Sequence, residues 1–481
     1  MKKNVLKALL IFFIALISSN CANDYDDNPR STSVNDFVWK GLNQYYYWLE
    51  EEPDLADNRF ASTNQYEQFL NSYNSPESLF EHLLFLEDES QNPNDFDRFS
   101  VIFSDYTALE QALTGNAKNN GVDYALRYLN GNTSSNTDEI FGWVRYILPN
   151  SDASGKNIER GDIFYAVNGT VLNESNYSSL LGQDNYTLNL ATLSNGVLIP
   201  NGESVNLTKT AYSENPVYMK KVFPIGAKKI GYLMYNGFYS DYDNELNNAF
   251  AFFQSEGITH LILDLRYNSG GSVATATYLA SMITGQFNGQ VFGKQQWNYK
   301  IENYYSNDPE QFINRFTNSL ENGAAINSLN LDKIYVLTSS RTASASELVI
   351  NGLKPYINVT QIGDVTYGKN VGSITLYDSP TFRKTNVNPA HKYAMQPIVL
   401  KIANANNFSD YAQGLNPTVN QVEDLENLGE IGETSDPLLN TALNYVDNNG
   451  RFSFPYQPNF TYKNVQPKSI SEQLEFEMYV K

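Results

Sequence analysis

The segment from Val336 to Lys369 constrains the fold of this chain more than any other part of the sequence. The apolar run Ile334 to Leu337 is typical of a buried strand, and the small residues that follow it allow a sharp turn. An amphipathic helix then opens at Ser346. A serine at a strand-to-helix turn, as Ser344 is here, lies where backbone N–H groups point outward without partners. The pattern therefore predicts an α/β unit with an acyl-transfer nucleophile at its turn.

The same segment contains a candidate base for that nucleophile. Lys369 lies in a glycine-rich turn, Thr366 to Lys369, on the next strand-like segment. A desolvated lysine amine can be neutral near pH 7 and accept the serine proton. Either feature alone is commonly structural, because small-residue turns precede many helices and most lysines are solvated. Together they indicate a Ser-Lys dyad, which is a recognised variant of the catalytic triad.

The two motifs together resemble the nucleophile and base segments of the C-terminal processing peptidases. In that family the nucleophile is the first serine of an Ala-Ser-Ala-Ser-Glu run, which corresponds to Ser344, and the base lies in Thr-x-Gly-Lys, which corresponds to Lys369. The family commonly has a glutamine four residues later that orients the lysine, and this chain has Ser373 there. The resemblance therefore leaves the orienting role open to Ser373, to Thr366, to another side chain or to a water.

A second strand–turn–helix unit precedes this segment. Residues 261–266 predict a buried strand, 268–271 a turn with two glycines, and 273–282 a helix. The unit lacks a Walker lysine and the full Gly-x-Gly-x-x-Gly spacing, so it does not predict a phosphate site. We expect Asp264 and Arg266 to pair with each other and fix the loop rather than take part in chemistry.

This unit resembles the Asp-Leu-Arg-x-Asn-x-Gly-Gly motif of the same peptidase family. The resemblance implies that Gly270 or Gly271 supplies one N–H group to an oxyanion hole. Ala345, the residue after the nucleophile, would supply the other. Two preorganised donors of this kind are typically worth a few kcal/mol of barrier each.

Residues 107–212 are β-rich and resemble a PDZ domain, most clearly from Val144 to Gly169. PDZ domains bind chain ends by strand addition and hold the terminal carboxylate in a backbone nest. The corresponding loop contains Gly121, Val122, Asp123 and Tyr124. Asp123 stands where the PDZ pattern has glycine, and a carboxylate opposes a peptide carboxylate. Both peptide binding and a degenerate domain with a regulatory role therefore remain open.

The N-terminal residues predict export. Residues 1–20 combine a basic start with a short apolar run and are typical of a signal peptide, too short for a confident membrane span. Cys21 is the only cysteine of the chain and resembles the lipidated residue of a bacterial lipoprotein. Residues 21–34 would then be a lipidated, flexible tether. These features imply a lipid anchor at Cys21, in the cell envelope of a Gram-negative bacterium, as the only membrane contact.

The resemblance implies a multidomain α/β (α+β) fold. It comprises an N-terminal helical segment at 35–106, a PDZ-like β domain at 107–212 and a crotonase-like (ClpP/crotonase) α/β protease core at 213–450. Residues 451–481 form a C-terminal tail that is aromatic and polar and has no assignable motif.

Composition limits the classes of function. The formal net charge of −20 argues against nucleic acid as a partner. The sequence has no His, Cys or Glu spacing typical of metal ligands, so we expect neither a metal nor another cofactor. The leading hypothesis is a serine endopeptidase of the cell envelope acting on polypeptides, including unfolded or C-terminal segments. The alternative is a catalytically weak scaffold that binds peptides or apolar ligands, and the presence of both Ser344 and Lys369 argues against it.

Overall fold

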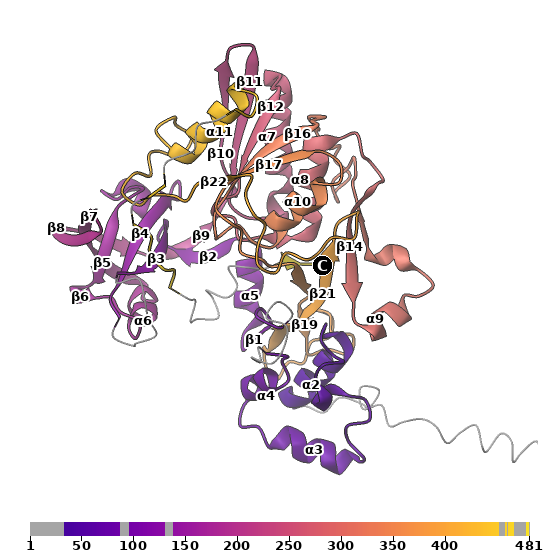
Figure 1. Ribbon diagram of the computed structural model, residues 1–481. Helices are drawn as coiled ribbons and strands as arrows, with labels where there is room; N and C mark the ends of the chain where they lie inside the picture. Colours follow the sequence, from indigo (N-terminus) through magenta and orange to yellow (C-terminus); the bar gives the residue numbers. More distant parts are fainter. Residues whose placement is uncertain are drawn as a thin grey trace, which may run out of the picture. The chain divides into compact units, whose positions relative to one another are not determined.

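The computed structural model describes residues 33–86, 96–129, 138–451, 457–458, 460–465 and 478–480 (Figure 1). The predicted signal peptide, the predicted lipidation site Cys21 and most of the predicted tether lie outside these residues. The chain divides into two compact units. The first contains Met1–Tyr106, Trp297–Pro309 and Ile374–Leu400, and the second contains the remaining segments. The first unit is therefore discontinuous, whereas the sequence suggested continuous ranges.

The first unit is mainly helical, with a small antiparallel sheet. Its elements are α2 (Val34–Tyr45), η1 (Pro53–Leu55), α3 (Thr63–Asn71), α4 (Pro76–His82), β1 (Val101–Phe103), α9 (Tyr299–Tyr304), β19 (Leu376–Tyr377) and β20 (Ala394–Gln396), with sheet order β1-β20-β19. Helix α4 begins at Pro76 because the Ser75 hydroxyl accepts from the Ser78 N–H and proline occupies the first turn. The buried Asp97 carboxylate accepts from the Tyr46 hydroxyl at 2.8 Å and fixes the end of the helical region.

The second unit begins with a β-rich part. Its elements are α5 (Tyr106–Leu113), β2 (Asn116–Asn119), β3 (Val122–Tyr128), β4 (Ile140–Ile147), η2 (Ala153–Gly155), β5 (Ile163–Val167), β6 (Thr170–Val171), α6 (Tyr177–Leu181), β7 (Asn185–Ser194), β8 (Val197–Thr208) and β9 (Thr210–Ser213). The main sheet has the order β3-β4-β5-β7-β8, with β6 on β5, and β2 pairs separately with β9. Strand β3 is thus an edge strand.

The structure corrects the predicted loop of residues 121–124. Only Gly121 precedes the strand, with a φ of +94°, and β3 already begins at Val122. Val122 is buried and pairs with Ile147 of β4, so cross-strand packing determines the conformation there. Asp123 is consequently a strand residue rather than a loop residue.

A six-stranded sheet forms the centre of the second unit (Figure 1). Its strands, in spatial order, are β10 (Val217–Ile225), β11 (Lys228–Tyr235), β12 (His260–Asp264), β16 (Lys333–Thr338), β17 (Asn358–Gly363) and β22 (Val419–Asn420). Strand β10 pairs antiparallel with β11, and the other neighbours pair parallel. The central parallel strands β11, β12 and β16 contain apolar, buried runs, as is typical of a parallel sheet that is covered on both faces.

Helices cover this sheet. They are α7 (Asp243–Glu256), α8 (Val273–Thr284), α10 (Ala345–Leu353) and α11 (Pro437–Asp447), with the short η3 (Ser240–Tyr242) and η4 (Pro309–Phe312) in connecting segments. Helix α8 packs against α7 and α10, while α11 packs against β16 and β17. The helix predicted to begin at Val273 is confirmed, as is the helix that follows Ser344.

A second six-stranded sheet connects distant segments. Its strands, in spatial order, are β13 (Gly271–Ser272), β23 (Met478–Tyr479), β18 (Val371–Ser373), β21 (Ile398–Ala403), β14 (Val291–Trp297) and β15 (Ile313–Arg315). Strand β23, from the tail, lies between β13 and β18.

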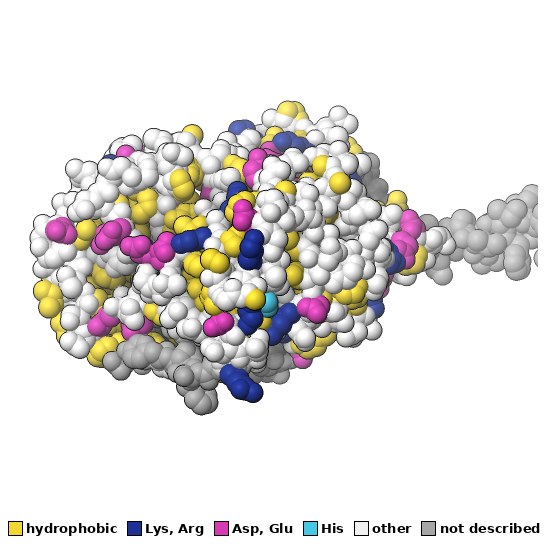
Figure 2. All heavy atoms as spheres, turned by 90° about the horizontal axis from the view of Figure 1, so that it is seen from above, with side chains coloured by type: hydrophobic (Ala, Val, Ile, Leu, Met, Phe, Trp, Pro, Cys, Tyr) yellow, Lys and Arg dark blue, Asp and Glu magenta, His cyan; other side chains and the backbone are white. Residues whose placement is uncertain are grey.

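On the face seen in Figure 2, basic and acidic side chains are interspersed over the described surface. Within the described ranges, no helix has the length and apolar character needed to span a bilayer.

Candidate active site

Three loops meet at one edge of the central sheet, where three neighbouring parallel strands end. Asp264 of β12 pairs with Leu337 of β16, and Thr338 pairs with Gly363 of β17, so the strands end at similar heights. The loops that follow contain the glycine turn, Ser344 and Lys369, respectively. The carboxyl ends of parallel strands are the usual position of sites in open α/β sheets. The sheet therefore brings the three predicted motifs together.

Backbone hydrogen bonds join these loops to one another. The Asn268 carbonyl accepts from the Ala343 N–H at 3.2 Å and from the Ser346 hydroxyl at 3.0 Å. The Tyr367 N–H donates to the Thr342 carbonyl at 2.9 Å. The glycine loop, the serine loop and the lysine loop are thus positioned as one assembly.

Ser344 has an unusual backbone conformation at a sharp turn. Its φ is +63° and its ψ is −118°, and α10 begins at the next residue, Ala345. A non-glycine residue in such a conformation costs about 1–3 kcal/mol and is common at functional sites. The side chain is fully buried, and among the described residues its hydroxyl has no hydrogen-bond partner. The strain and the unused hydroxyl together distinguish Ser344 from the other serines of this loop.

Glu347 connects the serine loop to the lysine loop, a role that the sequence analysis did not assign. Its buried carboxylate accepts from the N–H groups of Ser344, Gly368 and Lys369, each at 2.8 Å, and from the Thr366 hydroxyl. Burial raises the pKa of Glu347, and the hydrogen bonds oppose that rise. The available signal was its position three residues after Ser344, where a helix-capping carboxylate commonly lies.

Lys369 lies in the loop two residues before β18, and only 1% of its surface is exposed. Gly368 allows this path, because its φ is +94° and a Cβ there would lie 2.3 Å from the Ala412 carbonyl oxygen. Ser373, at the position of the family glutamine, is buried at the end of β18. Its hydroxyl donates to the Met478 carbonyl at 3.4 Å, so Ser373 contacts strand β23.

The glycine turn needs both of its glycines. Gly270 and Gly271 have φ values of +119° and +133°, and a Cβ on Gly271 would lie 2.5 Å from the Phe238 carbonyl oxygen. The Gly270 N–H donates to the Asn268 side-chain oxygen at 2.9 Å. Of the two glycine donors that the sequence offered, the Gly270 donor already has an acceptor within the loop.

The predicted pairing of Asp264 with Arg266 is confirmed. The Arg266 Nε lies 3.0 Å from both Asp264 carboxylate oxygens, and both side chains are fully buried. Arg266 also forms ion pairs with Asp436 at 2.7 Å and Glu423 at 3.2 Å. Burial by itself would raise the pKa of Glu423, but Arg160 and Arg266 lower it to about 2. This ionic cluster holds the loop that leads from β12 to the glycine turn.

We expect the cluster to make stability depend on pH through Glu423. A pKa lowered from 4.5 to about 2 contributes stability that is present above pH 4.5 and is lost as the pH falls towards 2. At about 1.4 kcal/mol per pKa unit, Glu423→Gln should lower the free energy of unfolding by about 3 kcal/mol at pH 7. The gap between wild type and variant should narrow between pH 4.5 and 2. Urea denaturation of wild type and Glu423→Gln, at pH 7 and again between pH 4.5 and 2, measures this difference in the free energy of unfolding. A difference that does not depend on pH would contradict this role of Glu423.

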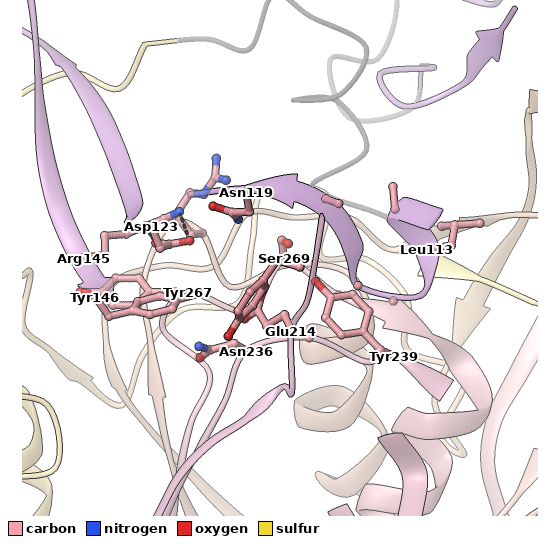
Figure 3. Close-up of a pocket in the computed structure, with 18 of the residues that line it drawn as sticks. Leu113, Asn119, Asp123, Arg145, Tyr146, Glu214, Asn236, Tyr239, Tyr267 and Ser269 are labelled. Carbon is pink, nitrogen blue, oxygen red and sulfur yellow. Dashed lines mark hydrogen bonds and ion pairs between the residues drawn. The ribbon is translucent and has the colours of Figure 1, made fainter. Parts of the chain in front are cut away.

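A cavity of about 260 Å³ lies beside the glycine turn and is lined by Ser269, Gly270 and Gly271 (Figure 3). Figure 3 also shows the ion pair between Asp123 and Arg145 at this cavity, in which Arg145 Nη2 lies 3.1 Å from the carboxylate. Arg145 therefore offsets the Asp123 charge that the sequence analysis singled out.

Two further polar side chains of the cavity were not anticipated from the sequence. Burial, together with the nearby Asp123 carboxylate, raises the pKa of Glu214 to about 8. Asn236 is 7% exposed, and a side-chain hydrogen bond between Asn236 and Glu214 partly opposes this rise. Both side chains line the cavity next to the glycine turn. Within the described ranges, His, Cys, Asp and Glu side chains form no group of three that could hold a metal ion.

Comparison with known proteins places the three loops within a family match. The family model "Peptidase family S41" matches residues 229–380, and the model "Peptidase S41 N-terminal domain" matches residues 33–101. A CtpA-like serine protease of Staphylococcus epidermidis is 27% identical over 162 residues, which are 33% of this chain and 29% of that protein. A carboxyl-terminal-processing protease of a Picosynechococcus strain is 25% identical over 229 residues, which are 47% of this chain and 50% of that protein. The chain thus matches half or less of the length of these relatives.

A solved structure covers much more of the chain. An S41 protease of Bacteroides fragilis aligns with a TM-score of 0.63 and 26% identity, over 86% of this chain and 97% of that one. The two family models together include the glycine turn, Ser344 and Lys369, and they reach into the first unit. These comparisons support a relationship of the chain to peptidase family S41 and to the carboxyl-terminal-processing serine proteases.

Proposed function

We propose that this chain is a serine endopeptidase that hydrolyses polypeptide bonds through a Ser344–Lys369 dyad. One observation carries the proposal. Ser344 is held in a strained conformation with an unused hydroxyl, and the single carboxylate of Glu347 bonds both its N–H and that of Lys369. A purely structural turn has no need for a strained serine, a buried lysine and a buried carboxylate that joins them.

The mechanism follows from the groups present. The Ser344 hydroxyl attacks the scissile carbonyl, and the Lys369 amine accepts its proton and later donates it to the leaving amine. Burial disfavours the charged form of an amine, which suits Lys369, at 1% exposure, to act as the base. A water then hydrolyses the acyl-enzyme, with Lys369 again accepting the proton.

The N–H groups of Gly271 and Ala345 would stabilise the tetrahedral oxyanion. Gly271 is assigned this role because the Gly270 N–H already donates to Asn268. Ala345 is the first residue of α10, so its N–H has no acceptor within the helix. Both donors belong to backbone that the loop assembly holds in place, as such stabilisation requires.

We further propose a fold type for each part of the second unit and a cellular location for the chain. Residues 107–212, with the sheet β3-β4-β5-β7-β8 and α6, are assigned as PDZ-like, and residues 213–450 as a crotonase-like core. The sequence of the first 34 residues supports an exported, lipid-anchored protein of the cell envelope, attached at Cys21. Its substrates would be polypeptides, including unfolded or C-terminal segments.

One observation favours the scaffold alternative. Ser373 replaces the orienting glutamine of the family, and its hydroxyl bonds the Met478 carbonyl. The shorter side chain of a serine would orient Lys369 less firmly than a glutamine, and the chain would then bind peptides without cleaving them efficiently.

A fluorophosphonate probe that labels active serines separates the two functions. We expect wild type to be labelled and Ser344→Ala to remain unlabelled, with Ser340→Ala, a serine of the same loop, as the matched control that keeps the label. Peptide mapping by mass spectrometry should place the adduct on Ser344. Labelling that persists in Ser344→Ala would refute the assignment. The absence of labelling in a folded chain, both at full length and after removal of residues 478–481, would favour the scaffold.

A further inference from the structure

The tail, for which the sequence shows no motif, adds a strand to the edge of the β-rich part of the second unit. The Tyr128 N–H of β3 donates to the Lys463 carbonyl at 3.0 Å, and the Val465 N–H donates to the Leu126 carbonyl at 3.2 Å. The bridge between these two bonds is antiparallel. Because β3 is the edge strand of its sheet, residues 463–465 can pair with its open edge, and they do so through one isolated antiparallel bridge.

Side chains of this added segment lie in a groove. Val465 packs against the hydrophobic cluster of the β-rich part, together with Tyr124 and Leu126 of β3. The cavity there, of about 420 Å³, is lined both by β3 and by Tyr177 of α6. A strand added to a sheet edge with its side chains in an adjoining pocket is how many domains bind peptides. The tail therefore has the position of a bound peptide.

A second part of the tail, β23, adds a strand beside the candidate active site. Met478 pairs in parallel with Gly271 of the glycine turn, and Tyr479 pairs in parallel with Ser373 of β18. The Val480 N–H donates to the Ser373 carbonyl at 3.1 Å. Strand β23 is thus flanked by the proposed oxyanion segment on one edge and by the strand that follows Lys369 on the other.

The side chains of β23 are buried in the second unit. Met478 is fully buried, Tyr479 is 7% exposed, and the Tyr479 hydroxyl donates to the Leu113 carbonyl at 3.3 Å. Tyr479 also lines the cavity of Figure 3 beside the glycine turn. Ser344 and Lys369 are themselves 0% and 1% exposed. A polypeptide cannot reach a dyad this deeply buried unless part of the surrounding structure moves.

We propose that residues 460–465 and 478–480 act as an intramolecular ligand that occupies two peptide-binding positions of this chain. One is the groove between β3 and α6, and the other is the strand position between β13 and β18. The ligand that fits both is an extended polypeptide with apolar or aromatic side chains, since the tail presents Val465, Met478 and Tyr479 there. This inference rests on the proposed function for the second position, where the displaced strand would make room for a substrate.

Covalent attachment makes such a ligand effective. A tethered segment acts at an effective concentration on the order of millimolar, so a free peptide of ordinary affinity displaces it poorly. The consequence is low basal reactivity of Ser344, which rises when the tail leaves the strand position.

Deleting residues 478–481 tests the second position. We expect the rate of fluorophosphonate labelling at Ser344 to rise by about tenfold or more, in line with loss of a tethered competitor. A fluorescent peptide of residues 472–481 should bind the shortened chain in an anisotropy titration and should not bind the full chain. The same peptide N-methylated at the nitrogen of Val480 is the matched control and should bind weakly, because it lacks the N–H that donates to Ser373. Equal binding of both peptides, or none, would overturn the inference at this position.

A point variant protects the test against a deletion that fails to fold. Val480→Pro removes the same N–H within the full chain, and we expect it to accelerate labelling as the deletion does. Circular dichroism and thermal melting identify which variants are folded. A folded Val480→Pro chain with the wild-type labelling rate would contradict the inference.

The groove at β3 is tested separately. Val465→Asp places a charge in the apolar groove and should allow a fluorescent peptide of residues 460–468 to bind. Lys463→Gln is the matched control, because Lys463 contacts β3 through its carbonyl and its side chain is exposed. Binding to neither chain, or equally to both, would overturn the inference at this groove.

Peptide binding distinguishes this inference from the proposed function, because it can be measured in a Ser344→Ala background. If the peptide binds the shortened Ser344→Ala chain but Ser344 is not labelled in the full or the shortened chain, the intramolecular ligand is supported and the peptidase proposal is contradicted. If Ser344 is labelled at the same rate with and without the deletion, and no peptide binds, the peptidase proposal is supported and the intramolecular ligand is contradicted.

Discussion

Ser344→Ala and Lys369→Ala are each expected to lower the turnover of casein by about 10³-fold or more. A nucleophile and its base act as a unit, so the loss of either leaves only substrate binding and the oxyanion donors. The double variant should therefore be no less active than the single ones. The measurement is kcat/KM for fluorescent casein, with a form of the chain that begins at Ala22.

Lys369→Arg sharpens this test. It places a permanent positive charge there and keeps much of the side-chain volume, but a guanidinium cannot lose its proton in a protein and cannot serve as a base. We expect it to be as inactive as Lys369→Ala. An active Lys369→Arg chain would show that lysine contributes charge rather than proton transfer. Casein turnover that survives Ser344→Ala in purified protein would show that the nucleophile lies elsewhere.

Glu347→Ala is expected to have the second largest effect, on both stability and activity. Three buried N–H groups, of Ser344, Gly368 and Lys369, would lose their acceptor, and each unsatisfied donor costs about 1–3 kcal/mol. We therefore expect the free energy of unfolding to fall by about 3 kcal/mol or more, as measured in urea. Because Glu347 acts by positioning Ser344 and Lys369, kcat should fall while KM changes little.

Glu347→Gln provides the matched control. One carboxylate oxygen accepts from Ser344 and Lys369, and the other accepts from Gly368 and the Thr366 hydroxyl. A glutamine can keep an oxygen on one side only, and its NH₂ group then faces an N–H donor on the other. We expect an intermediate loss of stability and of kcat. A Gln variant equal to wild type would show that the carboxylate does not hold the two loops together, and a rise in KM alone would assign it to substrate binding.

Local sequence was sufficient where a structural element and its role depend on neighbouring residues. The apolar run before Ser344, the small residues of its turn and the helix after it are found as predicted. The helix from Val273, after the turn with two glycines, is also found as predicted. Asp264 and Arg266 pair as expected, because two opposite charges at the end of a buried strand must neutralise each other.

Contacts between distant segments were beyond such reasoning. The role of Glu347 depends on Gly368 and Lys369, which lie about twenty residues away and reach it only because β16 and β17 are neighbours. The choice between Gly270 and Gly271 depends on the side chain of Asn268. The composition of the first unit depends on two segments that return to it from later in the chain.

By itself, the sequence determined the strand–turn–helix units and the chemical groups at their turns, because backbone propensities and side-chain chemistry are local properties. Only the tertiary structure decided which loops meet, and where the tail lies. Strand addition uses N–H and C=O groups that every residue except proline possesses, so residues 463–465 and 478–480 needed no motif to pair with β3, β13 and β18. Their placement depends on which sheet edges the rest of the fold leaves open, and a sequence read residue by residue does not contain that information.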